Sequence, residues 1–503
     1  MSTPASQLEL SRASEDAHPP ALPPHQPHDA DAGTIKELMR VALPLIISSG
    51  SLSLMHVVDR IMLTWLSVDA VAAAMPAGMF HWTALGFPLG VAMYTNTFVA
   101  QYHGADRRDR LAAAVWQGVW LALAFGAMLI AFAPILSLVF KSLGHAPAVT
   151  QLEIEYFSVL CWGSAPMLLT ATLSAFFSGR GQNAVVMWVD LAVSILNGVL
   201  AYVLIFGKGP IPALGIRGAA VATVSANVAA CAAFAVMICR TNQRERYPFR
   251  EERRYDRELI TRMLRFGLPN GIQLLVDIGA YLLFVLVVGG LGTVELAATN
   301  LAFNLNALAF VPMLGMGTAV LTIVGRRIGE GRPDLAAKSV WRALAAAEGY
   351  ILFFVTLYVF APDLLLAPYA AQSSTVSTPG HPSFAEVRPV VTQLLYFVAA
   401  YCFFDAMAIV FGNAIRGAGD TKFSLIYTAA CGWFLMVVPS LIIVRTVAYP
   451  LWGCWWATTA NITALGTGLC LRFLGGKWRS MTVIEHGPAE IDAPIPTTGD
   501  PLT

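Results

Sequence analysis

Five acidic residues stand inside long apolar stretches of the sequence: Asp59, Asp190, Asp277, Glu348 and Asp405. An ionisable side chain in the hydrocarbon core of a membrane is energetically expensive, so such a residue is treated as functional by default. Asp277 and Asp405 each lie about 20 Å along the predicted helix from one end, at 1.5 Å per residue, and cannot easily reach the lipid headgroups. We therefore interpret these two carboxyl groups as functional.

Asp190 and Glu348 leave two interpretations open. Each is either functional or structural, and a structural acid either reaches the membrane interface from a helix end or is protonated and hydrogen-bonded inside the bundle. For these two residues the structural interpretation is favoured, although Asp190 stays a candidate for lining an ion or substrate path.

Amide side chains accompany the acids inside the apolar stretches: Asn197, Asn300, Asn304 and Asn306. Contact with lipid penalises an amide that has no hydrogen-bond partner. Asn300 and Asn304 are one helical turn apart and share a face. Together with Asp277 and Asp405 they offer the oxygen ligands that Na⁺ or a hydrated cation prefers. Asn197 is a further candidate for lining the ion or substrate path.

The elements that must hold these residues are membrane-spanning helices. Of 503 residues, 56% are hydrophobic and only 13% are charged, and the mean hydropathy is +0.63. Soluble domains carry about 25% charged residues, whereas here apolar runs of roughly 20 residues recur, each long enough to cross a bilayer as a helix. A water-soluble fold is excluded, and the net charge of +1 gives no indication of a nucleic-acid partner.

The pattern predicts an all-α polytopic membrane protein of about twelve transmembrane helices in two six-helix lobes. We expect a disordered cytoplasmic tail at 1–34, an N-terminal lobe at 35–240, a basic cytoplasmic linker at 241–258, a C-terminal lobe at 259–476 and a cytoplasmic tail at 477–503. The predicted helices are Leu38–Leu66, Ala72–Tyr102, Leu111–Phe140, Leu152–Phe177, Ala184–Phe206, Ile216–Cys239, Leu259–Gly290, Leu296–Gly325, Ala336–Ala361, Val391–Ile415, Phe423–Val444 and Pro450–Leu474.

The distribution of basic residues predicts the orientation of these helices. Cytoplasmic loops carry an excess of Lys and Arg. With the N-terminus inside, only six of the 32 Lys and Arg fall outside, namely Arg60, Lys141, Lys208, Arg217, Arg388 and Arg445. Both termini are therefore predicted to be cytoplasmic. The seven cysteines form no CxxC pair, so neither a disulfide framework nor a zinc site is indicated.

The two halves of the chain repeat each other. "RVALP" at Arg40–Pro44 falls on "RFGLP" at Arg265–Pro269, an offset of 225 residues. The same offset superposes Gly90 on Gly315, Gly104 on Gly329 and Trp116 on Trp341. Because each half has six helices, both halves cross the membrane in the same sense, and a pseudo-two-fold axis along the membrane normal should relate them. That arrangement is typical of alternating-access transporters.

Three separated motifs resemble the multidrug and toxic compound extrusion (MATE) family, in particular its NorM-like branch, over about Ile35 to Lys477. They are "VVDRIMLTWLSVDAVAAA" at Val57–Ala74, "GLPNGIQLLVD" at Gly267–Asp277 and "FDAMAIVFGNAIRGAGDTK" at Phe404–Lys422. The resemblance implies that Asp59, Asp277 and Asp405 are cation-coupling residues.

The chain departs from the family pattern at three positions. The NorM-type branch usually has Glu at the position of Asp277, and a small residue at that of Arg60. The DinF-type branch has an Asp at what aligns with Ala201, and its absence favours the NorM type. Asp190 is left without an assigned role.

These observations predict a multidrug efflux antiporter of the bacterial inner membrane, a monomer that exports amphipathic, cationic organic compounds in exchange for Na⁺ or H⁺. No cofactor or catalytic residue is expected, and no metal other than a transported Na⁺. A flippase for lipid-linked saccharides is the alternative, but it would need a cationic groove, and the central residues here are acidic. An intramembrane enzyme is more remote, since the sequence has neither HExxH nor GxSxG.

Overall fold

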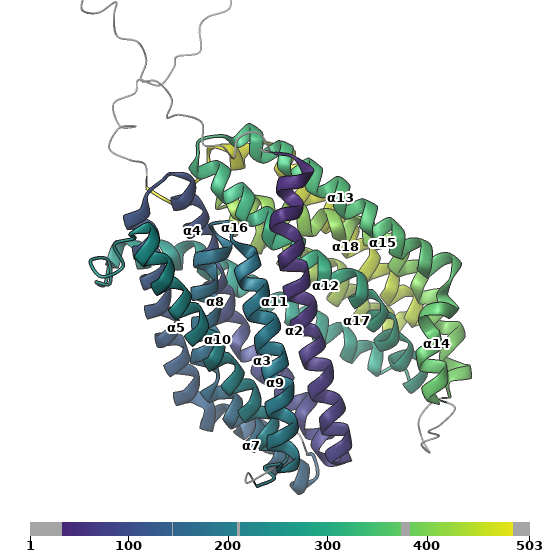
Figure 1. Ribbon diagram of the computed structural model, residues 1–503. Coiled ribbons are helices and arrows are strands. Elements are labelled where there is room, and N and C mark those ends of the chain that lie inside the picture. Colours follow the sequence, from purple (N-terminus) through teal and green to yellow (C-terminus); the bar gives the residue numbers. More distant parts are fainter. Residues whose placement is uncertain (1–32, 143, 209–211, 374–382, 486–503) are drawn as a thin grey trace, which may run out of the picture.

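The computed structural model describes residues 33–142, 144–208, 212–373 and 383–485. These residues form mainly helices joined by short loops, with no strand among them (Figure 1). Inside a bilayer every backbone N–H and C=O must be satisfied within the protein, and a helix does this locally. Ten helical stretches are long and apolar enough to cross a membrane. The helices α3 and α18 run beside them and complete the predicted set of spans.

The N-terminal lobe contains the predicted first six spans, some of them divided by short breaks. The chain breaks at Tyr94 between α3 and α4, at Ser137 between α5 and α6, and at Gly163 between α7 and α8. The elements are α2 (Ile35–Leu66), α3 (Val68–Met93), α4 (Thr95–Gly104), α5 (Arg108–Leu136), α6 (Leu138–Ser142), α7 (Pro147–Trp162), α8 (Ser164–Ser178), α9 (Asn183–Phe206) and α10 (Ile216–Glu245).

The C-terminal lobe contains the other six spans and one short helix that the sequence did not predict, α14. A π-helical segment, η2, interrupts the eleventh span. The elements are α11 (Arg257–Gly289), α12 (Thr293–Gly329), α13 (Pro333–Phe360), α14 (Pro362–Ser373), α15 (Phe384–Ala418), α16 (Thr421–Cys431), η2 (Gly432–Val437), α17 (Val438–Thr446), α18 (Pro450–Leu474) and the 3₁₀ turn η3 (Lys477–Ser480).

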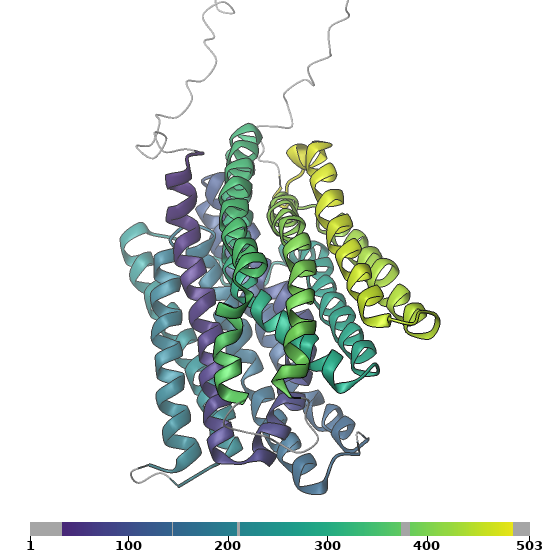
Figure 2. The ribbon, with the colours of Figure 1, turned by 90° about the vertical axis from the view of Figure 1, so that its right-hand side faces the viewer.

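Ion pairs identify one end of the bundle, which we call the terminal end. Here Arg327, near the end of α12, pairs with Glu37 at the start of α2 at 2.6 Å. Arg479 of η3 likewise pairs with Asp334 at the start of α13 at 3.1 Å. The start of α2 and the segment after α18 therefore lie at the same end, uppermost in Figures 1 and 2.

Close glycine contacts join the two lobes in repeat-related pairs. A Cβ on Gly104 of α4 would lie 2.0 Å from the carbonyl oxygen of Arg326, and one on Gly329 of α12 would lie 2.1 Å from that of Gln101. Adding 225 to 101 and 104 gives 326 and 329, so each contact is the symmetry mate of the other. An interface in which residue i meets j and j meets i is the mark of a two-fold axis. The predicted pseudo-two-fold relation is confirmed.

A second reciprocal pair lies deeper in the bundle. A Cβ on Gly90 of α3 would lie 2.5 Å from Gly271 of α11, and one on Gly315 of α12 would lie 2.6 Å from Ile46 of α2. Ile46 and Gly271 are themselves 225 residues apart. The lobes thus meet along α2–α12 and α3–α11, and α4 packs on the end of α12.

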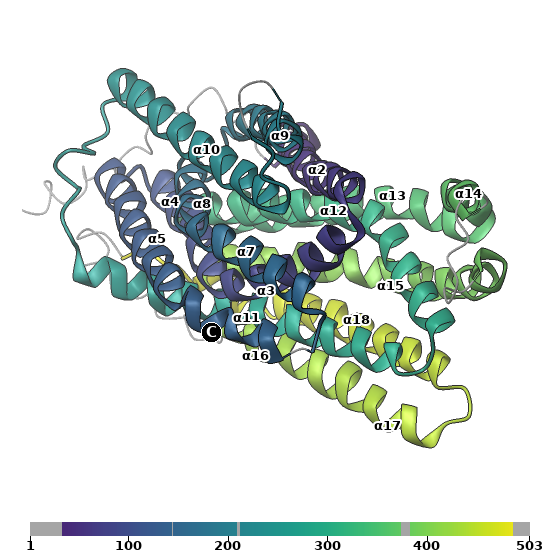
Figure 3. The same cartoon turned by 90° about the horizontal axis from the view of Figure 1, so that it is seen from below.

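Away from the terminal end the two sets of helices diverge (Figure 1). Viewed along the bundle, α5, α8, α9 and α10 lie on one side and α13, α14, α15 and α17 on the other (Figure 3). The close inter-lobe contacts involve the first part of α2, the last part of α3 and the end of α12. The lobes are therefore in contact at the terminal end and apart at the opposite end.

The segment after position 476, predicted as a tail, is described as far as Glu485. It forms η3 and then packs against the bundle, with the Trp478 and Val483 side chains buried. The tail predicted at 1–34 lies almost entirely outside the described residues, as do positions 486–503.

Candidate functional site

The first predicted carboxylate, Asp59, is buried between α2 and α9. The Asn197 side chain, which is fully buried, donates from Nδ2 to Asp59 Oδ1 at 2.8 Å. The Asn197 Oδ1 atom is buried without a hydrogen-bond partner. The structure thus brings together two residues that the sequence singled out separately. Their remaining oxygen atoms are available to a cation, or to a water molecule that carries a proton.

Asp190 belongs to the same helix pair. The Ser48 hydroxyl of α2 donates a hydrogen bond to Asp190 Oδ2, and nearer the terminal end Asn183 Nδ2 donates to the Val41 carbonyl oxygen at 2.7 Å. Asp190 and Asn197 are seven residues, or about 10 Å, apart along α9. Together with the bond between Asn197 and Asp59, three side-chain hydrogen bonds therefore join α9 to α2 inside the membrane. Asp190 thus has a hydrogen-bond partner inside the helix bundle, and its role stays a prediction.

Asp277 is exposed although it lies in the interior of α11. On one side of it α11 packs against α3, because Leu274 and Ile278 face Gly86 of the other lobe. On the other side Gln273 accepts a hydrogen bond from Ser424 of α16 at 2.9 Å. An ionised carboxylate facing lipid would be costly, and the neighbouring contacts place Asp277 beside the line where the two lobes meet.

The helix face of Asp277 also carries polar groups that the sequence analysis did not single out. The Gln273 side chain lies one turn before Asp277 on α11, and Arg416 of α15 donates from Nη1 to Oδ1 of Asn270, about two turns before Asp277, at 3.4 Å. Gln273 is fixed by Ser424 and, at 3.4 Å, by the Thr428 hydroxyl. The four-residue spacing between Gln273 and Asp277 was the available signal, since it places both on one helix face. Nothing comparable in the sequence pointed to Arg416.

Asp405 lies on α15 within the C-terminal lobe and is less exposed than Asp277. Cys402 precedes it by three residues on α15. The Sγ atom of Cys402 lies 3.5 Å from Oδ1 of Asn306 on α12. In the same lobe, Glu348 Oε2 of α13 is buried without a hydrogen-bond partner among the described residues. Glu348 is therefore a further acid inside the C-terminal lobe whose carboxylate is not fully satisfied by hydrogen bonds.

The predicted grouping of Asp277 and Asp405 with two amides stays a prediction. Within the described residues no hydrogen bond or ion pair joins the two carboxylates. Asn300 and Asn304 are exposed on α12 and form no hydrogen bond in the described part of the chain. The amide that approaches Cys402, beside Asp405, is Asn306. It is two residues after Asn304, so it lies on a different face of α12 from Asn300 and Asn304.

The part of the chain that the structure describes holds no group of three or more His, Cys, Asp or Glu side chains that could bind a metal ion. A cation at any of these sites would be bound by one or two carboxylates together with amide, hydroxyl or carbonyl oxygens. Such mixed oxygen ligation suits hard cations rather than zinc or copper.

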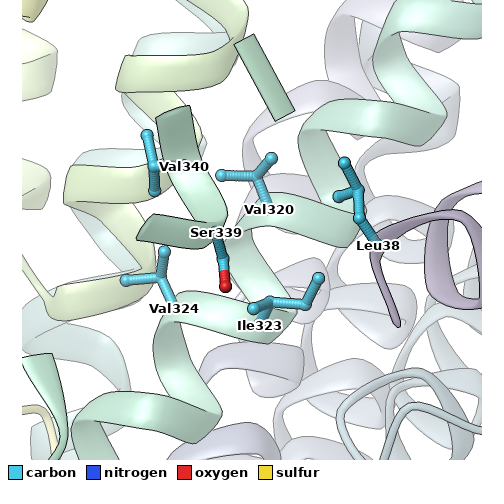
Figure 4. A pocket seen from close by; sticks show the side chains of 6 residues that line it. All are labelled: Leu38, Val320, Ile323, Val324, Ser339 and Val340. Carbon is cyan, nitrogen blue, oxygen red and sulfur yellow. The ribbon is translucent and has the colours of Figure 1, made fainter. Parts of the chain in front are cut away.

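A small pocket between α2, α12 and α13 is not a candidate site (Figure 4). It has no volume for a water molecule, and its single polar side chain, Ser339, donates to the Leu335 carbonyl oxygen. The lining residues are Leu38, Val320, Ile323, Val324, Ser339 and Val340. This pocket is part of the packed contact between α2 and the C-terminal lobe.

Comparison with known proteins gives consistent matches along the chain. The sequence profile of the MatE family matches residues 44–203 and 269–442. A protein of Pseudomonas putida described as "Probable multidrug resistance protein NorM" is 28% identical over 475 residues, which cover 93% of this chain and 99% of the relative. A protein of Agrobacterium fabrum with the same description is 25% identical over 444 residues, covering 87% of this chain and 93% of the relative.

Solved structures agree in fold. A structure described as the "Outward-facing conformation of a multidrug resistance MATE family transporter of the MOP superfamily" superposes with a TM-score of 0.79. The match has 22% sequence identity and covers 89% of this chain and 97% of the other. At that identity the similarity establishes the fold, including the twelve-helix, two-lobe arrangement.

Proposed function

This chain belongs to the MatE family of integral membrane transporters, and from that premise we propose that it exports amphipathic, cationic organic compounds in exchange for Na⁺ or H⁺. The observation that carries the proposal is the exposed Asp277 carboxylate beside the line where the lobes meet. The printed description of its relatives, multidrug resistance protein, supports the substrate class. A negative charge at that place attracts cations of both kinds, inorganic and organic.

The coupling follows from the difference between two states. An ion shifts a conformational equilibrium only by as much as its affinities for the two states differ. A carboxylate that is open to water in one state and enclosed in the other provides such a difference, because enclosing it is costly unless a cation or proton neutralises it. Cation entry at Asp277 or Asp405 would then displace the organic cation and favour closure of the lobes around the neutralised site.

We propose different ions for the two lobes. Among the described residues, Asp59 has one amide partner and no second carboxylate within hydrogen-bonding distance, which suits a proton. The C-terminal lobe offers Asp277, Asp405 and Glu348 with nearby amides, which suits Na⁺. A Na⁺ gradient would thus drive transport through the C-terminal lobe, and Asp59 would add a dependence on pH.

The orientation and location are also part of the proposal. The excess of Lys and Arg at the terminal end supports a cytoplasmic position for both termini, which makes the structure one that is closed toward the cytoplasm. The bacterial relatives support a place in the bacterial inner membrane. The family's fold has both lobes in one chain, so a monomer is sufficient.

Inside-out membrane vesicles test this function. Vesicles from cells that produce the protein should accumulate cationic dyes when a Na⁺ or proton gradient is imposed in the exporting direction. Vesicles containing the Asp277→Asn variant at the same protein level should not. Equal dye uptake with and without every ion gradient would refute cation-coupled export.

A further inference from the structure

After η3 the chain leaves the C-terminal lobe and crosses to the N-terminal lobe. We call residues Met481–Glu485 the strap. The Val483 side chain is 1% exposed and packs in an apolar cluster built mainly from α4, α5, α8 and α10. The Thr482 hydroxyl and the Val483 N–H both donate to Oε1 of Gln101 on α4, at 2.8 and 2.9 Å. The end of the second repeat is thus bound to the first.

The strap lies between the two lobes rather than on one of them. Gln101 Nε2 donates to the carbonyl oxygen of Gly417 of α15 at 2.9 Å, so the amide that holds the strap also joins α4 to the C-terminal lobe. A Cβ on Gly419, in the turn between α15 and α16, would lie 3.0 Å from Val483 Cγ1. Val483 is therefore enclosed by α4 on one side and this turn on the other.

Glu485 ends the strap in a set of basic residues from both lobes. On the N-terminal lobe its carboxylate accepts from the Tyr102 hydroxyl at 2.7 Å, from Arg107 Nη2 at 2.8 Å and from Arg110 Nε at 2.7 Å. From α11 it accepts from Arg262 Nη1 at 2.6 Å. Charge-assisted bonds of this kind are about twice as strong as neutral ones. One carboxylate neutralises guanidinium groups on both sides of the interface.

The Glu485 carboxylate stays ionised under physiological conditions. Burial by itself would raise its pKa, but the Tyr102 hydrogen bond and the charges of Arg110 and Arg107 outweigh burial and hold the pKa at about 2. Protonation therefore does not release the strap at any cytoplasmic pH. Ionic strength is the relevant variable, because salt screens partly exposed charges.

The repeat symmetry does not account for the strap. At the offset of 225, Gln101 and Tyr102 correspond to Arg326 and Arg327, which bind Glu330 and Glu37 instead. The segment that follows α10 in the first repeat stays on its own lobe, where Tyr247 and Phe249 pack in the same apolar cluster as Val483. The strap segment thus has no counterpart in the other half of the molecule, where Glu37 of α2 pairs directly with Arg327 of α12 across the lobes.

We propose that the strap is an electrostatic latch that holds the two lobes together at the terminal end. When this end opens, the strap cannot keep its contacts with both lobes, so Glu485 must leave Arg107 and Arg110. Without Glu485, Arg110 would keep its second partner, Asp256 at the start of α11, at 2.9 Å. Arg107 would face Arg262 across the interface with no carboxylate between them, and like charges would repel. The role of the latch rests on the proposed transport function, because opening of the terminal end would admit substrate from the cytoplasm.

Distances between spin labels on the two lobes test the latch. Labels at Asp109→Cys on α5 and Lys338→Cys on α13 report the separation at the terminal end, in protein whose native cysteines have been replaced and which is held in lipid nanodiscs. Glu485→Gln should raise the ratio of separated to closed lobes about tenfold. Glu258→Gln is the matched control, because Glu258 also pairs with Arg262 but is exposed and lies on one lobe. It should leave the ratio unchanged.

Salt gives a second measurement on protein with an intact strap. Raising the ionic strength should shift the labelled parent in the same direction as Glu485→Gln, and should shift the Glu485→Gln variant much less. A variant that is folded by size-exclusion chromatography but keeps the parent's distances, or a control that opens equally, would overturn the latch. The distances need no substrate, so a protein that latches but does not export dye would refute the transport function alone.

Discussion

Replacing either of two repeat-related glycines, Gly329 or Gly104, with alanine should open the terminal end. A Cβ on Gly329 would lie 2.1 Å from the Gln101 carbonyl oxygen, and one on Gly104 would lie 2.0 Å from that of Arg326. Both obstacles are backbone atoms within helices, so no side chain can turn away to make room. The new methyl group fits only if the two helices separate.

The size of the effect follows from these distances. Ordinary contact begins near 3.4 Å, so α4 and α12 must part by about 1.3 Å at this point. Overpacking of a close contact costs about 1–3 kcal/mol. The contact exists only when the terminal ends are together, so the cost falls on the closed state, and a difference of that size shifts the equilibrium about 5- to 150-fold. Because the two contacts are symmetry mates, the two variants should respond alike.

The spin-label pair on α5 and α13 measures this shift. The matched control is Gly349→Ala on α13, where a Cβ meets nothing within 4 Å. Alanine there should keep the closed distances and, through its better helix propensity, slightly raise thermal stability. If Gly329→Ala and Gly104→Ala keep both the closed distances and the parent's melting temperature, the proposed packing of α4 on α12 is wrong.

Four further outcomes are expected. Asp59→Asn should flatten the pH profile of transport in proteoliposomes yet retain Na⁺-driven flux, and loss of all Na⁺ response with an intact pH profile would contradict the division between the lobes. Asp277→Asn and Asp405→Asn should each abolish ion-driven efflux in membranes that contain normal amounts of protein, whereas Asp277→Glu should retain more activity. Full ion-driven efflux in both Asn variants would exclude these acids from the coupling mechanism. The ratio of separated to closed lobes should be constant between pH 8 and 5. The pKa of Glu485 is depressed, so its stabilisation of the closed state is complete above the ordinary glutamate value of 4.5 and is lost only as the pH falls toward about 2. Opening already at pH 6 would point to another group. A reporter fused within the linker at Arg253 should read cytoplasmic, and an external signal there would overturn the orientation.

Much of the fold could be predicted because the bilayer restricts the chain so strongly. Apolar length gives the helices, and the superposition of Gly104 on Gly329 gave the two-fold relation that the reciprocal contacts confirm. The breaks at Tyr94 and Gly163 were not predicted, although Thr95–Thr97 follow the first and Pro166 lies just after the second. They depend on packing between spans, as at Gly163, where a Cβ would lie 2.6 Å from Val224 of α10.

The candidate site was predictable in its members more than in its grouping. An acid inside an apolar helix is recognisable in the sequence because its burial in a membrane is energetically costly. Asp59 and Asp277 were identified as candidates in this way. Which helices adjoin in space is set by tertiary packing, so the hydrogen bond between Asn197 and Asp59 and the approach of Cys402 to Asn306 were not evident. The strap was missed for a similar reason, because Thr482–Glu485 follows the last apolar run and looks like a solvated tail.

The most direct test of the account is flux through the purified protein. In proteoliposomes loaded with a cationic dye, an inward Na⁺ gradient should drive dye out of the liposomes through those protein molecules whose terminal end faces the lumen. Dye should in turn promote Na⁺ entry. The Asp277→Asn variant, reconstituted at equal density, should show neither movement. Dye efflux that proceeds equally in the variant, or that moves no cation in exchange, would contradict the claim that intramembrane carboxylates couple export to a cation.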